Sequence, residues 1–230
     1  MEVETPDLKF VPVTLAADRG STRALGGRPV LTSVVAIGLP VVQQITEELV
    51  GEDEALRQFV RRSYREWQFH LVHLGCSFHA RDGMQIAKAQ VAVRLDVEQA
   101  GDRPQAIVWS LIPQRMERPV DITQGLKVGA KLGFAETTVE VTSAGKGAEV
   151  FVEAYGLQES GCSWDFRQTP RDSISGTHRL ALIARSPRNV VTNGQVTVGA
   201  TISYRRFKLM PFRLELADQP PVMFELDSRR

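Results

Sequence analysis

The residues with the clearest capacity for chemistry form a spaced series before the middle of the chain. His70, His73, Cys76 and His79 recur at every third position and include three of the four histidines and one of the two cysteines. Imidazole and thiolate groups bind zinc and copper, so the series is a candidate metal site. The surrounding sequence favours a strand, however, and residues three apart on a strand point to opposite faces. We therefore expect His70 and Cys76 on one face and His73 and His79 on the other, and we predict no metal or other cofactor.

A second candidate is a hydrolytic site around His178. This histidine follows Ser173, Ser175 and Thr177, and Asp172 is close in sequence. A Ser-His-Asp triad is assembled in space, so nearness along the chain gives it little support. The sequence also has no Gly-x-Ser-x-Gly nucleophile motif. We predict no catalytic residue here, and we interpret the enzyme class as an alternative that would need an unfamiliar site.

A basic row is the third candidate. Arg57, Arg61 and Arg65 recur at every fourth position of a predicted helix. Arginines near aromatic residues can bind single-stranded nucleic acid. The acidic run at residues 52–54 precedes the row by about one helical turn, which favours a solvated face with weak ion pairs. Since 28 Lys and Arg against 27 Asp and Glu leave a net charge of +1, no overall field attracts nucleic acid. We predict that the row contacts a protein partner.

Residues 126–156 suggest a different function. Apolar and polar residues alternate along most of this range, and the Gly145-Lys146-Gly147 turn divides it into two arms. A membrane-spanning strand needs only about 9–11 residues, and a long amphipathic hairpin is what a pore-forming β protein inserts. Hairpins on the surface of ordinary β proteins have the same pattern. Membrane insertion through residues 126–156 is therefore the alternative function.

Two helices are predicted before the strands begin. In the first, over about 39–50, apolar residues follow helical spacing, Pro40 lies near the start and Gly51 occupies a C-terminal cap position. The second begins at the acidic residues 52–54, which suit the positive end of a helix dipole. Its predicted buried face includes Phe59, Val60, Tyr64 and Trp67.

From about residue 67 the hydrophobic period changes from 3.6 to 2, which is typical of strands. The predicted strands include 68–79 and 87–97, joined as a hairpin through Asp82-Gly83, and 105–112, with Ile107, Trp109 and Leu111 facing the core. Further strands are expected at 126–134, 137–142, 149–155, 179–185, 195–204 and 207–216. Strands without intervening helices favour antiparallel sheets packed face to face.

The predicted fold is therefore mainly β: an antiparallel β-sandwich or flattened barrel with an N-terminal helical pair packed against it. Residues 1–29 form an irregular segment with a possible edge strand around Pro12, which cannot donate to a ladder. Residues 30–66 form the helical pair and residues 67–230 the β domain, in one compact unit.

Two cysteines in 230 residues make a poor disulfide framework. The N-terminus is acidic, and the most apolar run, residues 30–42, is shorter than the roughly 20 residues of a transmembrane helix. We expect a cytoplasmic, soluble protein.

The C-terminus carries the remaining functional prediction. Pro220-Pro221 precedes a strand in which Val222, Phe224 and Leu226 share one apolar face. A proline-led terminal strand can add itself to the sheet edge of another subunit. We predict a non-enzymatic interaction or scaffold module that binds another protein or a second copy of itself.

Overall fold

The computed structural model describes residues 5–17, 30–50, 54–80, 84–98, 104–117, 150–169, 173–206, 210–218 and 220–226. One helix, α1 (Glu54–Ser63), and twelve strands are present in these ranges. The strands are β1 (Phe10–Ala17), β2 (Val30–Gln44), β3 (Trp67–Phe78), β4 (Met84–Val97), β5 (Ile107–Ile112), β6 (Arg115–Met116), β7 (Val152–Tyr155), β8 (Gly161–Arg167), β9 (Gly176–Pro187), β10 (Thr192–Arg206), β11 (Met210–Asp218) and β12 (Val222–Leu226).

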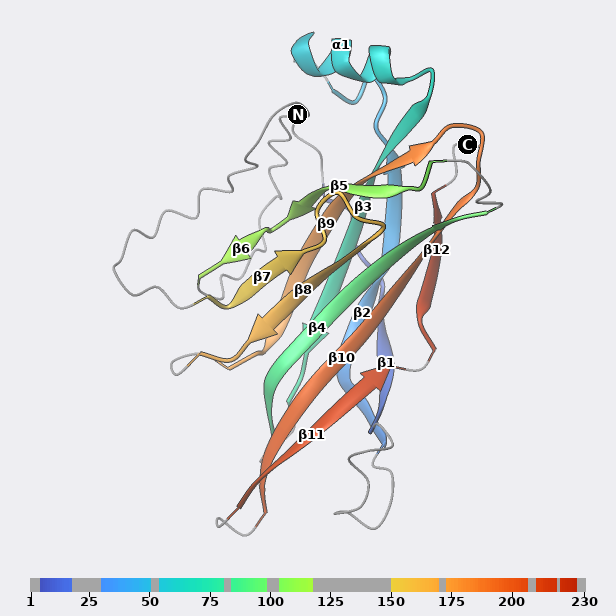
Figure 1. Cartoon of the computed structure of the whole chain (residues 1–230). Helices are drawn as coiled ribbons and strands as arrows, with labels where there is room; N and C mark the ends of the chain where they lie inside the picture. The colour runs from blue at the N-terminus through green and yellow to red at the C-terminus, as the bar shows by residue number, and fades with distance from the viewer. Residues whose placement is uncertain are drawn as a thin grey trace.

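The strands pair in the order β5-β9-β3-β2-β1-β11-β10-β4-β8-β7-β6, and β12 pairs with β10 beside this path (Figure 1). Each of these pairs is antiparallel. The prediction of a mainly β, antiparallel fold is therefore confirmed.

The two ends of the strand path belong to one stretch of chain. β5 begins the path and β6 ends it, yet only Pro113 and Gln114 separate them in sequence. Backbone hydrogen bonds also join β5 to the other end of the path, because Val108 N donates to Glu159 O and Gln158 N donates to Val108 O, both at 2.8 Å. The path of pairings consequently returns to the segment from which it started.

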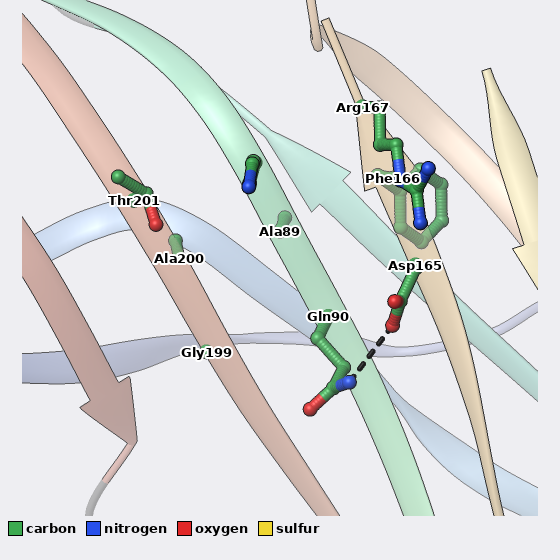
Figure 2. Close-up of a pocket in the computed structure, with 9 residues that line it drawn as sticks. Ala89, Gln90, Asp165, Phe166, Arg167, Gly199, Ala200 and Thr201 are labelled. Atoms are coloured by element: carbon green, nitrogen blue, oxygen red, sulfur yellow. Dashed lines mark hydrogen bonds between the residues drawn. The ribbon is translucent and has the colours of Figure 1, made fainter. Parts of the chain in front are cut away.

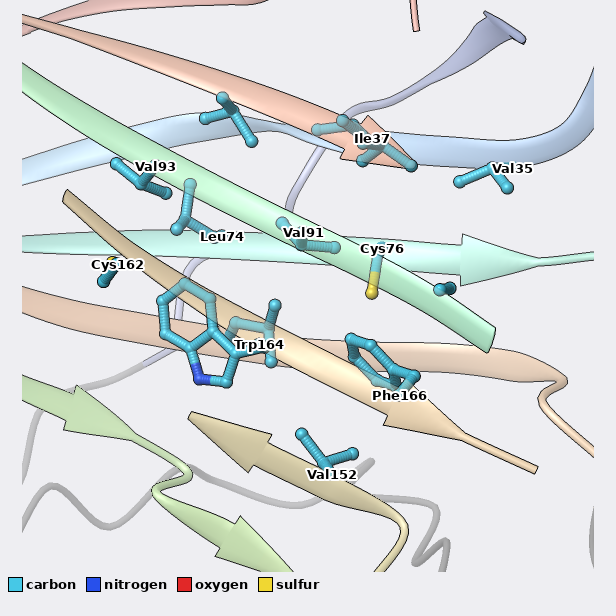
Figure 3. Close-up of a cluster of buried hydrophobic side chains, with 14 of the residues drawn as sticks. Val35, Ile37, Leu74, Cys76, Val91, Val93, Val152, Cys162, Trp164 and Phe166 are labelled. Atoms are coloured by element: carbon cyan, nitrogen blue, oxygen red, sulfur yellow. The ribbon is translucent and has the colours of Figure 1, made fainter. Parts of the chain in front are cut away.

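The main core lies where β2, β3 and β9 face β4, β8 and β10 (Figures 1 and 3). The rings of Phe78 on β3 and Phe166 on β8 meet edge to face with centroids 5.1 Å apart. Trp164 is fully buried, and its Nε1 donates a hydrogen bond to the carbonyl of Pro113 at 3.0 Å. Alternating apolar residues of opposed strands thus fill the interior, as the period-2 pattern predicted.

The predicted helical pair is wrong in its first member. Residues 30–44 form the strand β2, and only the second predicted helix is present, as α1. The apolar spacing over 39–50 resembled a helix, but β-branched residues dominate residues 30–42 and favour the extended chain. Pro40 lies where the register with β3 shifts between Gly38 and Val41, so no ladder bond requires its missing N–H.

The predicted hairpin between 68–79 and 87–97 is also wrong. β3 pairs with β2 and β9, whereas β4 pairs with β10 and β8, so these consecutive strands lie on opposite sides of the core. An Asp-Gly dipeptide indicates a local change of direction, but it does not fix which strands pair. β3 is buried along nearly its whole length on both faces, which is typical of a central strand.

β1 is an edge strand over only half of its length. It pairs with β2 throughout residues 10–16, but β11 joins its other side only at residues 15–17. Pro12 therefore lies on the half of β1 that has one neighbour in this ladder, which agrees with its missing N–H. In the part of the chain that the structure describes, no helix has the length and apolar character needed to span a membrane.

Candidate functional site

The histidine and cysteine series is divided between the faces of β3. Cys76 is fully buried in the main core, whereas His73 lies on the opposite face, also buried. His70 is buried near Ser186, and His79 follows the strand end, where its Nε2 lies 2.8 Å from Ser77 Oγ. The predicted separation is confirmed for Cys76 and His73, and no group of three metal-binding side chains is assembled among the described residues.

His178 belongs to an aromatic part of the core. Its ring lies 5.2–5.8 Å from the ring centroids of Phe78, Phe151 and Phe166, and its Nε2 is 3.0 Å from the carbonyl oxygen of Ser175. Asp172, the predicted neighbour, is outside the described residues. His178 is therefore a core side chain held by a hydrogen bond to the backbone.

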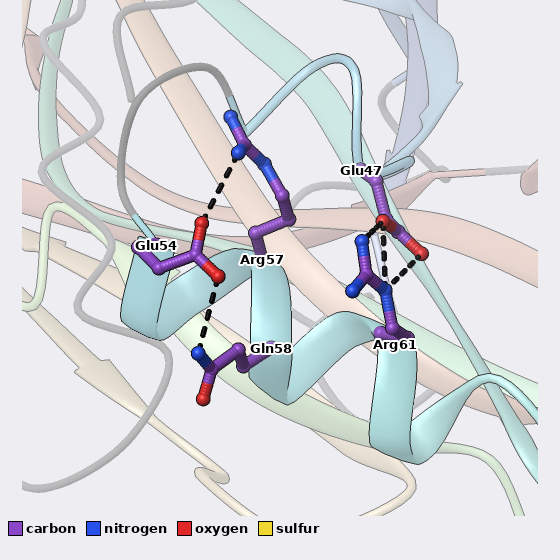
Figure 4. A network of polar contacts seen from close by, with 5 residues as sticks. All are labelled: Glu47, Glu54, Arg57, Gln58 and Arg61. Carbon is purple, nitrogen blue, oxygen red and sulfur yellow. Dashed lines mark hydrogen bonds and ion pairs between the residues drawn. The ribbon is translucent and has the colours of Figure 1, made fainter.

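The basic row lies on α1 and the turn after it (Figure 4). Arg57 Nη1 bonds to Glu54 at 3.1 Å, and Arg61 Nη2 bonds to Glu47 at 2.6 Å. The hydrogen bond from Arg61 holds the pKa of Glu47 below its usual value. The predicted solvated face with ion pairs is confirmed, although the partner of Arg61 comes from the turn before α1. Arg65 is exposed in the turn after α1.

The C-terminal strand β12 pairs with β10 of its own chain. Leu226 is buried, and Val222 and Phe224 pack partly buried against the main core, so the three share a face as predicted. The Phe224 ring occupies the space beside Gly194, where an added Cβ would lie 2.1 Å from Phe224 Cζ. This apolar face is therefore in contact with the chain's own core, and its binding of a partner stays a prediction.

The hairpin predicted at 126–156 lies mostly outside the described residues. Its last part includes β7, which pairs with β6 and β8. Membrane insertion through this range consequently stays a prediction.

An open groove with both polar and apolar lining residues crosses β10, β4 and β8 (Figure 2). Lys88 and Arg167 are direct cross-strand partners in it, and both are exposed. Beside them Gln90 Nε2 donates to Asp165 Oδ1 at 2.8 Å. Lys88 and Arg167 carry like charges opposite each other, which is unfavourable on a sheet, and the Asp165 carboxylate beside them offsets part of that charge. Because water screens exposed charges, the groove is a weaker candidate than the partly buried aromatic cluster around Arg185.

The strongest candidate is a cluster of aromatic rings around Arg185 on the outer face of β3, β5 and β9. The guanidinium carbon of Arg185 lies 4.2 Å from the ring centroid of Trp67 and 4.8 Å from that of Trp109. Phe59 on α1 and Phe69 on β3 complete the cluster, with ring centroids 5.5 Å apart and each within 6.0 Å of Trp109. A charged side chain is thus placed over two aromatic faces.

A β-bulge positions Trp109 in this cluster. The register between β5 and β9 shifts between Val108 and Ser110, so Trp109 is the extra residue. Bulges redirect side chains and are frequent next to functional sites. The prediction that Ile107, Trp109 and Leu111 share the core-facing side is wrong for this reason: Leu111 enters the main core, whereas Trp109 is half-buried and packs beside Phe59 and Phe69.

The electrostatics of Arg185 point to an anion. Burial lowers the pKa of its guanidinium, and its buried Nε has no hydrogen-bond partner. The ion pairs formed within the described residues include none to Arg185. A guanidinium whose face is covered by indole can still donate hydrogen bonds from its edge, and carboxylate and phosphate match that geometry.

Sequence reasoning missed Arg185. The available signal was an arginine directly after the apolar run 180–184, since a charge at a partly buried position of a strand needs a partner. Trp67 and Trp109 were predicted as core residues, and both are half-buried against the smaller apolar cluster beneath α1.

No family model and no curated protein matches this sequence.

Proposed function

We propose that the protein is a non-enzymatic binding module that receives an acidic segment of a partner protein at the α1 end of the molecule. The observation that carries the proposal is Arg185, a partly buried cation stacked on Trp67 and Trp109 with no acidic partner among the described residues. Arginine and tryptophan are also the residue types most often found to dominate binding energy at interfaces.

The surroundings of Arg185 support an acidic partner. Arg188 stacks on Tyr64 with its guanidinium carbon 4.0 Å from the ring centroid and donates to the Tyr64 carbonyl at 3.0 Å. Arg62 and Arg65 are exposed at the end of α1. The predicted partner-binding arginines Arg57 and Arg61 are already paired with glutamates, so they would contribute less than Arg65 and Arg185.

The fold supports a rigid presentation of this surface. We infer that the returning strand path is the flattened-barrel form of the predicted architecture, since both its ends are joined through residues 107–116. We propose the cytoplasm as the compartment of the protein, because both cysteines are free thiols and reducing compartments keep thiols free.

Tryptophan fluorescence gives a direct test. The chain has three tryptophans, and Trp164→Phe removes the one in the main core, leaving Trp67 and Trp109 to report on the site. We expect hexaglutamate to change the emission of this variant saturably and hexalysine to have no effect. Arg185→Gln in the same background should weaken hexaglutamate binding about tenfold or more, because a charge-assisted hydrogen bond contributes about 1.5–3 kcal/mol.

The matched control is Arg94→Gln, which removes an exposed arginine from β4. It should leave hexaglutamate binding unchanged. Equal affinities for the Arg185 and Arg94 variants, or binding of hexalysine as tight as that of hexaglutamate, would reject the proposal. Titration with inorganic phosphate distinguishes a carboxylate site from a phosphate site, since phosphate binding tighter than that of hexaglutamate would exclude an acidic segment as the preferred ligand.

A further inference from the structure

Residues 5–9 form a strap across the outer face of three strands, remote from Arg185 along β9. At the end of the strap nearest β1, the carbonyl of Lys9 accepts a hydrogen bond from Leu39 N on β2 at 2.9 Å. At the other end, Arg179 on β9 donates to the Pro6 carbonyl at 3.3 Å, and its Nη2 lies 4.0 Å from Asp7. The strap thus spans from β2 to β9, over β3.

Two glycines form the recess under the strap. Gly38 on β2 and Gly75 on β3 are direct cross-strand partners, and Arg179 is the next residue in that row. A Cβ at Gly75 would lie 2.9 Å from Leu8 Cδ1, and a Cβ at Gly38 would lie 3.1 Å from the same atom. The Leu8 side chain therefore occupies space that exists because both positions lack side chains.

Much of the strap is exposed to solvent. Leu8 is only partly buried, Lys9 and Phe10 are exposed, and the carboxylate of Asp7 is fully exposed at the edge of ion-pair distance from Arg179. Segments with little buried apolar surface and exposed polar contacts open locally at low cost. The exposure of this segment is therefore that of a segment suited to local opening.

A buried polar side chain beside the recess remains unsatisfied while the strap is in place. His73 lies two residues from Gly75 on the same face of β3 and is 2% exposed, yet neither of its ring nitrogens has a hydrogen-bond partner. Burial, together with the nearby positive charge of Arg179, holds the pKa of His73 below its usual value. The neutral ring has one donor and one acceptor, and buried polar groups in proteins are normally paired.

We propose that the Gly38–Gly75 recess is a docking site for an extended peptide with an acidic residue directly before a leucine, and that residues 5–9 are its resident, displaceable occupant. Asp7-Leu8 defines the chemistry: the leucine enters the recess and the acidic residue faces Arg179. A partner peptide that also hydrogen-bonds to His73 makes a contact that the strap lacks. This additional hydrogen bond favours the bound peptide over the strap.

The test uses the full-length chain and a fluorescein-labelled peptide with the sequence of residues 5–10, measured by fluorescence polarisation. Leu8→Asp should release the strap and vacate the recess, so we expect the peptide to bind this variant at least tenfold more tightly than the unaltered protein. The same peptide with serine in place of leucine should not bind. Leu157→Asp is the matched control, since Leu157 is an exposed leucine outside the strap, and it should leave peptide binding unchanged.

Two further variants locate the binding. Adding Gly75→Val to Leu8→Asp should fill the recess and abolish peptide binding, and adding Arg179→Gln should weaken it. Circular dichroism checks that each variant is folded. If the Leu8→Asp variant is unfolded, Leu8→Ala is used in its place. The proposal is overturned if a folded strap variant binds the peptide no more tightly than the unaltered protein, or if binding survives Gly75→Val.

Discussion

Cys76 and Cys162 are thiols that the fold keeps protonated. Burial raises the pKa of Cys162 to about 12 and raises that of Cys76 further. The thiolate is the reactive form, so both should resist iodoacetamide at pH 8 in the native protein and react in urea. Mass spectrometry of the alkylated protein measures this. Modification of either thiol at the rate of a free cysteine would contradict the burial.

The raised pKa values of the two thiols predict how the free energy of unfolding changes with pH. Their folded pKa values are above the unfolded value of about 8.5, so the stabilisation is fully present below pH 8.5 and is lost as the pH rises toward the folded pKa. Each thiol should lower the free energy of unfolding by up to about 1.4 kcal/mol per pH unit above pH 8.5. Urea denaturation between pH 8 and pH 10 measures the slope, and Cys162→Ala should reduce it.

Trp164 should be the most costly tryptophan to truncate. Its side chain is fully buried and bonds to the Pro113 carbonyl, whereas Trp67 and Trp109 are half-buried. We expect Trp164→Ala to lower the free energy of unfolding by about 3–5 kcal/mol and the other two truncations to cost less. Urea denaturation of the three variants compares them directly. A larger loss for Trp109→Ala would show that the cluster around Arg185 is more important to stability than the main core.

At the level of single residues, the sequence was informative where local geometry is regular. The face alternation of Cys76 and His73 follows from strand geometry alone, and it held. Trp109 was misplaced because one extra residue at a bulge reverses the phase, and nothing in the local pattern of residues 107–111 indicates a bulge. Arg185 was missed because its aromatic neighbours come from two other strands and are distant in sequence.

Among the elements, β2 shows the limits of apolar periodicity. Its β-branched residues favoured a strand, while the spacing of Leu39, Val42 and Ile45 favoured a helix, and neighbours distant in sequence decided between them. α1 was predictable because its amphipathic spacing and acidic first turn agree, and no β-branched run opposes them. Tyr64 was predicted on its buried face but is exposed, since the helix ends at Ser63.

The contact between Gly194 and Phe224 provides a test of how β12 is attached. Gly194→Val should destabilise the protein, because its side chain would collide with the Phe224 ring. Adding Phe224→Ala removes the obstacle, so the double variant should lose less stability than the sum of the two single losses, with a coupling of about 0.5–3 kcal/mol. Urea denaturation of the four proteins in the cycle measures this coupling. Additive losses would mean that β12 is not seated on β10 in solution.

At the scale of the whole molecule, the order in which the strands pair could not be predicted from the sequence. β1 near the N-terminus pairs with β11 near the C-terminus, and the consecutive strands β3 and β4 are not partners. Strand composition fixes which faces are apolar but not which of several similar strands lie side by side. The mainly β class and most strand positions were therefore predictable, whereas the return of the strand path to residues 107–116 was not.

The connection between β6 and β7 allows a test of the membrane-insertion alternative. Met116 and Val152 are cross-strand partners, so the stretch of about 35 residues between them starts and ends at one point of the ladder. Replacing residues 118–149 with Asn-Gly should preserve the circular dichroism spectrum, since Asn-Gly favours a tight connection and Met116 and Val152 already lie opposite each other. A loss of the native spectrum would show that residues 118–149 are needed for the fold.

Liposome leakage then separates the functions. If the alternative holds, the unaltered protein releases an entrapped dye and the shortened protein does not. If the binding-module proposal holds, neither protein releases dye, and the shortened protein still binds hexaglutamate.

The adjacency of Met116 and Val152 also has an evolutionary consequence. Because the chain leaves β6 and enters β7 at neighbouring residues, we expect the connection to change in length without altering the register of the described strand pairs. Homologous chains should consequently differ in length most at this point, while the spacing from β8 to β10 stays nearly constant. The same position, between β6 and β7, offers an insertion site for a reporter domain.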